Sequence, residues 1–438
     1  MSKSLNTLSA SVLVRRLQLR DISAEALLRD CLERIDAREN VVRAWAFLNR
    51  TAALERARAL DRGAVTGLLH GLPVGVKDIM DTVDMPTAYG SPIYADHQSV
   101  WDAASVALTR RAGAVLLGKT VTTEFAVFHP GPTTNPHNPL HTPGGSSSGS
   151  AAAVADHMVS LAFATQTGGS IIRPAAYCGI VGYKPSFNTL PRAGVKPLAD
   201  SLDTVGTFSR SVEDAALLAA AASGLQHLLL TPASNERPRV GLCRTWEWDE
   251  CDDSQKNAWL SAGALLTQQG FMVREISLPE HFKGLAHAQY QVMLRQQVQS
   301  LAFERIHHAA QLSPNLQSIL QQGEAVSDTD YMQAHVLIRQ CQQAFPDVFK
   351  SVDVLLVPSV TGEAPLGLKS TGNPIMNRIW TALHGPAITL PWGIGPAGLP
   401  TAVALVGLVG SDRQTLLAAQ AVERALAQQY PYPKPIIS

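Results

Sequence analysis

The spacing of apolar positions divides the chain into alternating helices and strands. Apolar residues recur every three to four positions along residues 9–38, which predicts two amphipathic helices, with Ser23 as the N-cap of the second. Residues 50–62 predict a further, charged helix. Short apolar runs predict buried strands at residues 72–79, 114–117 and 159–164, and helices are predicted at residues 105–112 and 150–155.

The pattern changes after residue 230. Residues 231–238, rich in Pro, Asn and Ser, predict a connection rather than an element. Strands are predicted at residues 239–243, 271–278 and 353–358, and helices at residues 254–268, 283–349 and 411–427. Strands that alternate with helices favour an α/β layer architecture.

Composition narrows the class of protein. The 438 residues are 46% hydrophobic and 16% charged, with a formal net charge of zero, which allows a large buried core. Without a basic stripe or a long apolar run, we expect neither nucleic acid nor a membrane as a partner. Five scattered cysteines and no signal-peptide core predict reduced thiols and a cytoplasmic location. A homodimer is the expectation from base rates alone.

Three glycine-containing segments carry the candidate chemistry. Lys77 lies in Gly-Leu-Pro-Val-Gly-Val-Lys-Asp, Ser146 in Pro-Gly-Gly-Ser-Ser-Ser-Gly-Ser, and Ser170 in Thr-Gln-Thr-Gly-Gly-Ser-Ile-Ile-Arg-Pro. None of the segments contains a histidine, so a nucleophilic serine there needs another base. Burial disfavours the ammonium form of lysine and can make it a base. Taken singly, each segment also fits a surface lysine, a flexible loop or a tight turn.

Together, the three segments resemble the signature of the amidase signature family of serine hydrolases, most strongly over residues 65–220. The resemblance implies one large α/β domain, in which helices cover both faces of a mixed, twisted sheet. Residues 65–220 would form the signature core and residues 351–438 would return to it. Residues 230–350 would be a βα and helical insertion beside it. No metal or organic cofactor is implied.

The resemblance also assigns roles to residues. It implies that Ser170 is the nucleophile, that Ser146, after a cis peptide bond, is a proton shuttle, and that Lys77 is the general base. The backbone N–H groups of four residues are expected to form the oxyanion hole, namely Thr167, Gly168, Gly169 and Ser170.

Two positions depart from the common family pattern Gly-Thr-Asp-x-Gly-Gly-Ser-Ile-Arg-x-Pro. Gln166 replaces the acid, and the arginine comes one place later, at Arg173. This combination resembles the malonamidase-like branch, which implies that Arg173 binds a substrate carboxylate. The alternative is that Arg173 pairs with a structural acid or carbonyl. Asn377 and Trp380, polar and aromatic positions in an apolar region, are further candidates for contact with substrate.

Other motifs are weaker. His137 and His141 have the spacing of a zinc pair, but the prolines around them disfavour the helix that such a pair needs, so no metal site is predicted. Cys178 could be a rival nucleophile, although a buried packing cysteine is the more common case. The Pro-Gly-Gly-Ser segment lacks the Gly-Lys-Ser/Thr ending of a phosphate-binding loop.

We therefore expect an amidohydrolase that converts a small, carboxylate-bearing amide to an acid and ammonia. One alternative is the amidase subunit of a tRNA-dependent amidotransferase, which the Gln166 and Arg173 variant and the modest length disfavour. Another is a catalytically silent binding homologue, which the joint presence of Lys77, Ser146 and Ser170 disfavours.

Overall fold

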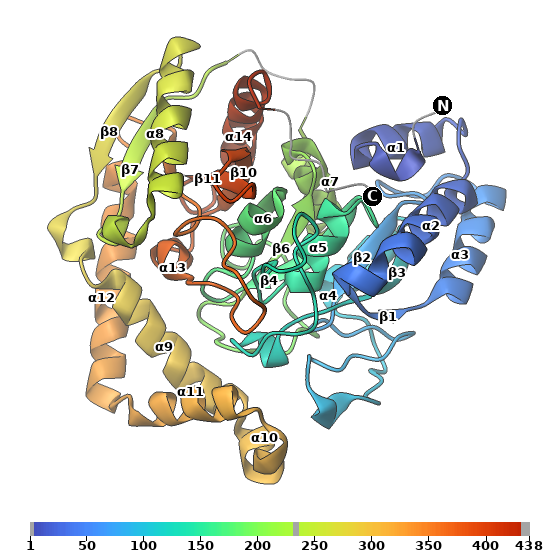
Figure 1. Cartoon of the computed structure of the whole chain (residues 1–438), viewed down its shortest axis with the longest axis horizontal. Coiled ribbons are helices and arrows are strands. Elements are labelled where there is room, and N and C mark those ends of the chain that lie inside the picture. Colours follow the sequence, from blue (N-terminus) through green and yellow to red (C-terminus); the bar gives the residue numbers. More distant parts are fainter. Residues whose placement is uncertain (1–3, 231–235, 431–438) are drawn as a thin grey trace.

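One mixed sheet organises the molecule (Figure 1). The computed structural model describes residues 4–230 and 236–430, and the eleven strands within them follow the order β1-β3-β2-β4-β6-β5-β10-β11-β9-β7-β8. At one end β2 is parallel to β3 and β4, at the other β7 is parallel to β8 and β9, and the strands between pair antiparallel. The strands are β1 (Trp45–Leu48), β2 (Pro73–Lys77), β3 (Val115–Thr120), β4 (Leu161–Gln166), β5 (Val181–Lys184), β6 (Thr204–Ser209), β7 (Val240–Arg244), β8 (Val273–Ser277), β9 (Val354–Pro358), β10 (Ala387–Ile394) and β11 (Pro400–Val406).

Helices cover both faces of this sheet, as β6 shows directly. Successive strand residues point to opposite faces. Gly206 faces α6, because a Cβ added to it would meet Ile171, the residue just before α6. Thr207 faces α7, because its Oγ1 donates to the carbonyl of Ala215 in that helix. The described helices are α1 (Ala10–Gln18), α2 (Ala24–Val42), α3 (Arg50–Arg62), α4 (Ala104–Arg111), α5 (Ser148–Ala155), α6 (Ile172–Cys178), α7 (Val212–Ser223), α8 (Asp253–Gln268), α9 (Leu285–Ser300), α10 (Ala302–His307), α11 (Pro314–Ala325), α12 (Asp328–Val348), α13 (Ile375–Ala382) and α14 (Asp412–Ala427). The α/β class with a mixed sheet is thus confirmed.

Most elements predicted from periodicity are present. The region 9–38 forms α1 and α2, and the Ser23 hydroxyl accepts from the Ala26 N–H as the N-cap of α2. The predicted strand that carries Lys77 is β2, and β7, α8 and β8 form the predicted parallel unit. The pattern missed β1, β5, β6, β10, β11 and α13. Most of the predicted connection at 231–238 lies outside the described residues.

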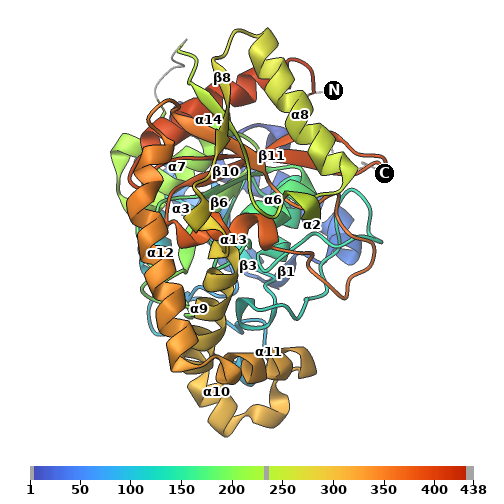
Figure 2. The same ribbon diagram turned by 90° about the vertical axis from the view of Figure 1, so that its left-hand side faces the viewer.

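Helices α9 to α12 form an arm that extends beyond the edge of the sheet (Figures 1 and 2). In Figure 2, α9 and α12 lie side by side, and they pack on each other. A buried carboxylate, Glu304 in α10, ties the arm to the rest of the molecule, because it accepts from Lys196 Nζ at 2.6 Å and from the Tyr94 hydroxyl at 2.7 Å. Closer to the sheet, Gln289 Nε2 in α9 donates to the carbonyl of Thr167 at 2.7 Å. The arm therefore contacts the segment that follows β4.

A membrane-spanning role finds no support in these helices. Within residues 4–230 and 236–430, none is both long enough and apolar enough to cross a bilayer.

Candidate active site

Lys77 ends β2, between the parallel strands β3 and β4, and its side chain has no exposed surface. Its ammonium nitrogen lies 2.8 Å from Ser146 Oγ and 2.7 Å from Thr165 Oγ1. Burial lowers the pKa of Lys77 well below the ordinary value, and the negative charge of Asp203 offsets part of that effect. Both neighbours are hydroxyl groups rather than carboxylates, so the site favours a neutral amine that can accept a proton.

Ser146 is held beside this amine by the segment that contains it. The Gly145–Ser146 peptide bond is cis, as the family resemblance implies. The next residue, Ser147, accepts from the backbone N–H of Thr165 at 3.2 Å, and α5 begins one residue later. The loop is therefore fixed to β4, the strand that leads to Ser170.

The turn after β4 carries Ser170, and Gln166 supports it from behind. Gln166 Oε1 accepts from the backbone N–H groups of Ile171 and Ile172, at 2.9 and 3.1 Å. Its Nε2 donates to Thr381 Oγ1 at 3.0 Å. Both ends of its side-chain amide thus form hydrogen bonds within the protein. Gln166 is not among the described residues that line the cavity next to Ser170. These contacts give Gln166 a role in shaping the turn, and its contact with substrate stays a prediction.

The residues expected to form the oxyanion hole line that cavity together with Ser146. The backbone N–H groups of Gly168, Gly169 and Ser170 donate no hydrogen bond to any described residue. Thr167 is fixed by its hydroxyl, which donates to Asp203, and by its carbonyl, which accepts from α9. Burial raises the pKa of Asp203 to about 6, although the Thr167 hydrogen bond acts in the opposite direction. The turn thus offers free amide donors on a fixed backbone.

Arg173, in the first turn of α6, is buried with a guanidinium that is only partly paired. Its Nη2 donates to the Gly145 carbonyl at 2.6 Å and to Thr371 Oγ1 at 3.1 Å. Its Nε and Nη1 are buried and have no partner among the described residues. Burial lowers the pKa of Arg173 to about 10, with a further lowering from the nearby charge of Arg378, so it remains a cation at neutral pH.

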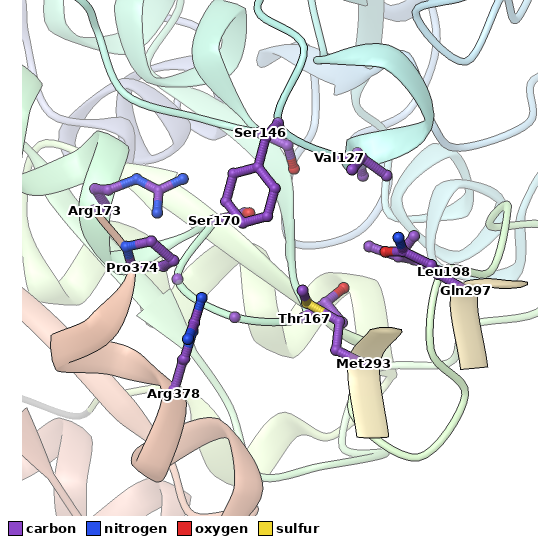
Figure 3. Close-up of a pocket in the computed structure, with 14 residues that line it drawn as sticks. Val127, Ser146, Thr167, Ser170, Arg173, Leu198, Met293, Gln297, Pro374 and Arg378 are labelled. Carbon is purple, nitrogen blue, oxygen red and sulfur yellow. The ribbon is translucent and has the colours of Figure 1, made fainter. Parts of the chain in front are cut away.

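The cavity has two different sides (Figure 3). Ser146 and Ser170 lie at its centre in this view. Three of the labelled residues lie on one side of the serines, namely Arg173, Pro374 and Arg378, and three lie on the other, namely Leu198, Met293 and Gln297. The lining is completed by residues 126–128 and by the turn at residues 167–169.

Comparison with known proteins agrees with this geometry. Residues 26–416 match the family described as Amidase. The chain belongs to the amidase family. A glutamyl-tRNA(Gln) amidotransferase subunit of Geobacter sp. strain M21 is 32% identical over 462 residues, which cover 93% of this chain and 95% of that protein. The fold and the family together make this amidase a hydrolase that acts on amide C–N bonds.

Two solved structures show how closely the amidase fold is shared. One, described as an amidase, matches with a TM-score of 0.87 and 29% identity, and covers 96% of this chain and 100% of that one. The other, the native peptide amidase from Stenotrophomonas maltophilia, matches with a TM-score of 0.79 and 26% identity, and covers 98% of both chains.

The two other residues expected to contact substrate, Asn377 and Trp380, both lie in α13 of this amidase. Asn377 is buried behind the turn, where its Nδ2 donates to the Ser359 carbonyl at 3.0 Å and a Cβ on Gly169 would lie 3.2 Å from it. Trp380 is buried against Phe345. Neither is among the described residues that line the cavity, so contact of either residue with substrate stays a prediction. The chain before α13 and its first turn instead contribute Pro374 and Arg378, four residues apart, which the sequence reasoning did not select as site residues.

The weaker motifs serve the fold of the amidase. His137 Nε2 lies 2.9 Å from the carbonyl of Cys178, and His141 Nδ1 lies 2.7 Å from that of Ala364. Within residues 4–230 and 236–430, no group of three or more His, Cys, Asp or Glu side chains could hold a metal ion. Cys178 donates from Sγ to the Pro143 carbonyl, and burial raises the pKa of its thiol far above neutrality, which disfavours it as a nucleophile.

Proposed function

We propose that this amidase hydrolyses a small amide that carries a carboxylate, through an acyl-enzyme on Ser170. The observation that carries the proposal is the guanidinium of Arg173, which lines the cavity of Ser170 and keeps two buried nitrogens unpaired. A carboxylate is the group that a guanidinium binds best in a bidentate manner. Arg378, on the same side of the cavity, adds a second positive charge.

The proposed cycle uses the three side chains in sequence. Neutral Lys77 accepts the proton of the Ser146 hydroxyl, which accepts that of Ser170, and Ser170 Oγ forms a bond to the amide carbonyl carbon. The backbone N–H groups of the turn stabilise the oxyanion. The proton then returns to the nitrogen, the C–N bond breaks, and ammonia leaves when the amide is primary. Water repeats the sequence on the acyl-enzyme and releases the acid. The contact of 2.8 Å between Lys77 Nζ and Ser146 Oγ supports the first step.

The experiment compares a small amide that bears a free carboxylate, such as the monoamide of malonic acid, with its methyl ester. We expect kcat/KM to be about 10- to 100-fold higher for the carboxylate, because the ester cannot accept a charge-assisted pair of hydrogen bonds. Arg173→Met should remove this preference, and Arg173→Lys should restore part of it. Equal kcat/KM for the acid and the ester in the native protein would contradict the carboxylate site.

A fluorophosphonate probe tests the nucleophile separately. We expect it to label the native protein and not the Ser170→Ala variant. Labelling would also exclude the silent binding homologue, because such a protein needs no activated serine. Absence of labelling in the folded native protein would refute the acyl-enzyme. We place the reaction in a reducing, cytoplasmic compartment, in line with five cysteines that are all buried and free.

A second candidate is the amidase subunit of a tRNA-dependent amidotransferase. Its support is the relative from Geobacter sp. strain M21, a glutamyl-tRNA(Gln) amidotransferase subunit that is 32% identical over 93% of this chain. The two candidates differ in whether the chain works alone. Hydrolysis of small carboxylated amides by the purified chain supports the first, whereas activity that appears only with copurifying subunits supports the second.

A further inference from the structure

The side of the cavity away from Arg173 includes one face of α9. Gln289, Met293 and Gln297 follow one another at intervals of four residues, so they share that face. Gln289 holds the Thr167 carbonyl at 2.7 Å, while Met293 and Gln297 line the cavity itself. Gln297 is therefore presented to the cavity by a helix that is hydrogen-bonded to the catalytic turn.

The amide of Gln297 is buried and unused. The residue has no exposed surface, and neither Oε1 nor Nε2 has a partner among the described residues. Leaving such a group without a partner in a folded protein costs about 1–3 kcal/mol for each unsatisfied atom. An amide side chain offers one acceptor and one donor side by side. The complementary ligand group is another amide-type unit, in which a C=O and an N–H are adjacent.

The position of Gln297 indicates which part of the substrate carries this unit. In Figure 3, Ser146 and Ser170 lie between Arg173 on one side and Gln297 on the other. If the carboxylate of the acyl part occupies Arg173, the group at Gln297 belongs to the other side of the scissile bond. That side is the leaving nitrogen and its substituent. Ammonia has no carbonyl and would leave the Nε2 donor of Gln297 unpaired.

We propose that the preferred substrate is a carboxylated amide whose scissile nitrogen bears an acyl or carbamoyl group, and that Gln297 recognises this group through two hydrogen bonds. The proposal rests on the proposed function and changes only the leaving group. Water adds to the acyl carbon, the C–N bond breaks and the nitrogen takes up a proton. The products are a dicarboxylic acid and a primary amide or urea, in place of ammonia.

The test uses the monoamide of malonic acid and its N-carbamoyl derivative, the monoureide, with malonate release as the readout for both. The native protein and Gln297→Met, which has a similar volume but no amide, are compared on each substrate. We expect Gln297→Met to lower kcat/KM for the monoureide by about 10- to 100-fold and to change that for the monoamide by less than about threefold. Because the variant is compared with the native protein on each substrate, the different reactivity of the two compounds cancels.

Two controls separate recognition from folding. Gln299→Met makes the same substitution at an exposed position of α9 and should leave both values unchanged. Gln297→Leu should repeat the effect of Gln297→Met, and both variants should melt cooperatively.

The outcomes also separate this proposal from the one it rests on. A loss by Gln297→Met that is equal on both substrates, or no loss, overturns the recognition of an amide-type group. So does failure of the native protein to hydrolyse the monoureide. None of these three results contradicts the carboxylate site, provided that the native protein still hydrolyses the free acid with a higher kcat/KM than the ester. Equal kcat/KM for the acid and the ester, together with a loss by Gln297→Met that is confined to the monoureide, would overturn the carboxylate site alone.

Discussion

Replacement of Lys77 by methionine tests the uncharged amine on which the proposed cycle depends. Methionine keeps the length of the side chain and removes the titrating nitrogen. Lys77 has no exposed surface, and its hydrogen-bond partners among the described residues are two hydroxyl groups. Its charged form has therefore lost its hydration without gaining a carboxylate partner among those residues. The folded protein should therefore release this proton at a lower pH than the unfolded chain, in agreement with the lowered pKa.

The size of the effect follows from proton linkage. Between the lowered pKa of the folded state and the ordinary value of about 10.4 in the unfolded chain, unfolding takes up one proton at Lys77. In that range the free energy of unfolding of the native protein should rise, relative to Lys77→Met, by about 1.4 kcal/mol for each pH unit. Below the folded pKa, or above about 10.4, both states carry the same number of protons at this position and the difference should be constant.

Urea unfolding, followed by tryptophan fluorescence between about pH 6 and 10, measures this difference directly. Lys350→Met, at a lysine whose side chain is 76% exposed, serves as the control and should follow the native pH dependence. Parallel curves for the native protein and Lys77→Met would refute the argument. The variant should also lose about 10²- to 10⁴-fold in kcat. In the native protein, kcat/KM should rise with pH through the pKa of Lys77, and a flat profile into acid would contradict a lysine base.

Two further substitutions test the support around the site. In Gly169→Ala, the new Cβ would lie 3.1 Å from Pro374, so the turn should shift. We therefore expect kcat to fall about 10- to 100-fold in steady-state assays. An unchanged kcat would contradict the need for a residue without a side chain at this position. Asp156→Ala would leave Arg34 and Arg38 without the buried carboxylate they contact at 2.7 and 3.2 Å. The free energy of unfolding should fall by about 3–5 kcal/mol in urea titrations with kcat unchanged, and a loss below about 1 kcal/mol would show that the two arginines find other partners.

The parts of the fold that the sequence predicted are those with a strong local signal. The amphipathic α1 and α2 repeat their apolar positions over many residues, and β2 is a continuous buried run. Strand β5 escaped notice because it has only four residues, and β6 because its apolar residues are interrupted by glycine, threonine and serine. Strand β10 contains proline and glycine, and its antiparallel pairing with β5 and β11 depends on chain segments far apart in sequence. Local patterns carry no information about such pairing.

A similar limit applies to the site. Lys77, Ser146 and Ser170 could be selected from the sequence because their three segments together resemble the amidase signature, although each segment alone does not stand out. For Gln166, the sequence shows only that glutamine stands where the family pattern has an acid. It does not reveal that the side-chain amide accepts from two backbone N–H groups. Gln297 lies in a glutamine-rich helical region, where nothing in the sequence distinguishes the one that faces the cavity from its exposed neighbours.

The two helices that wall the cavity have a consequence for how such enzymes diverge. The proposed nucleophile, relay and base all come from the stretch between β2 and α6, whereas α9 and α13 come from distant parts of the chain. Mutations in these later helices can remodel the pocket without disturbing the proton path. Arg173 is the exception, because it lies three residues after the nucleophile, on the helix that follows it. In the proposed scheme, changes in α9 can therefore alter the leaving group, while Arg173 is inherited together with the reaction itself.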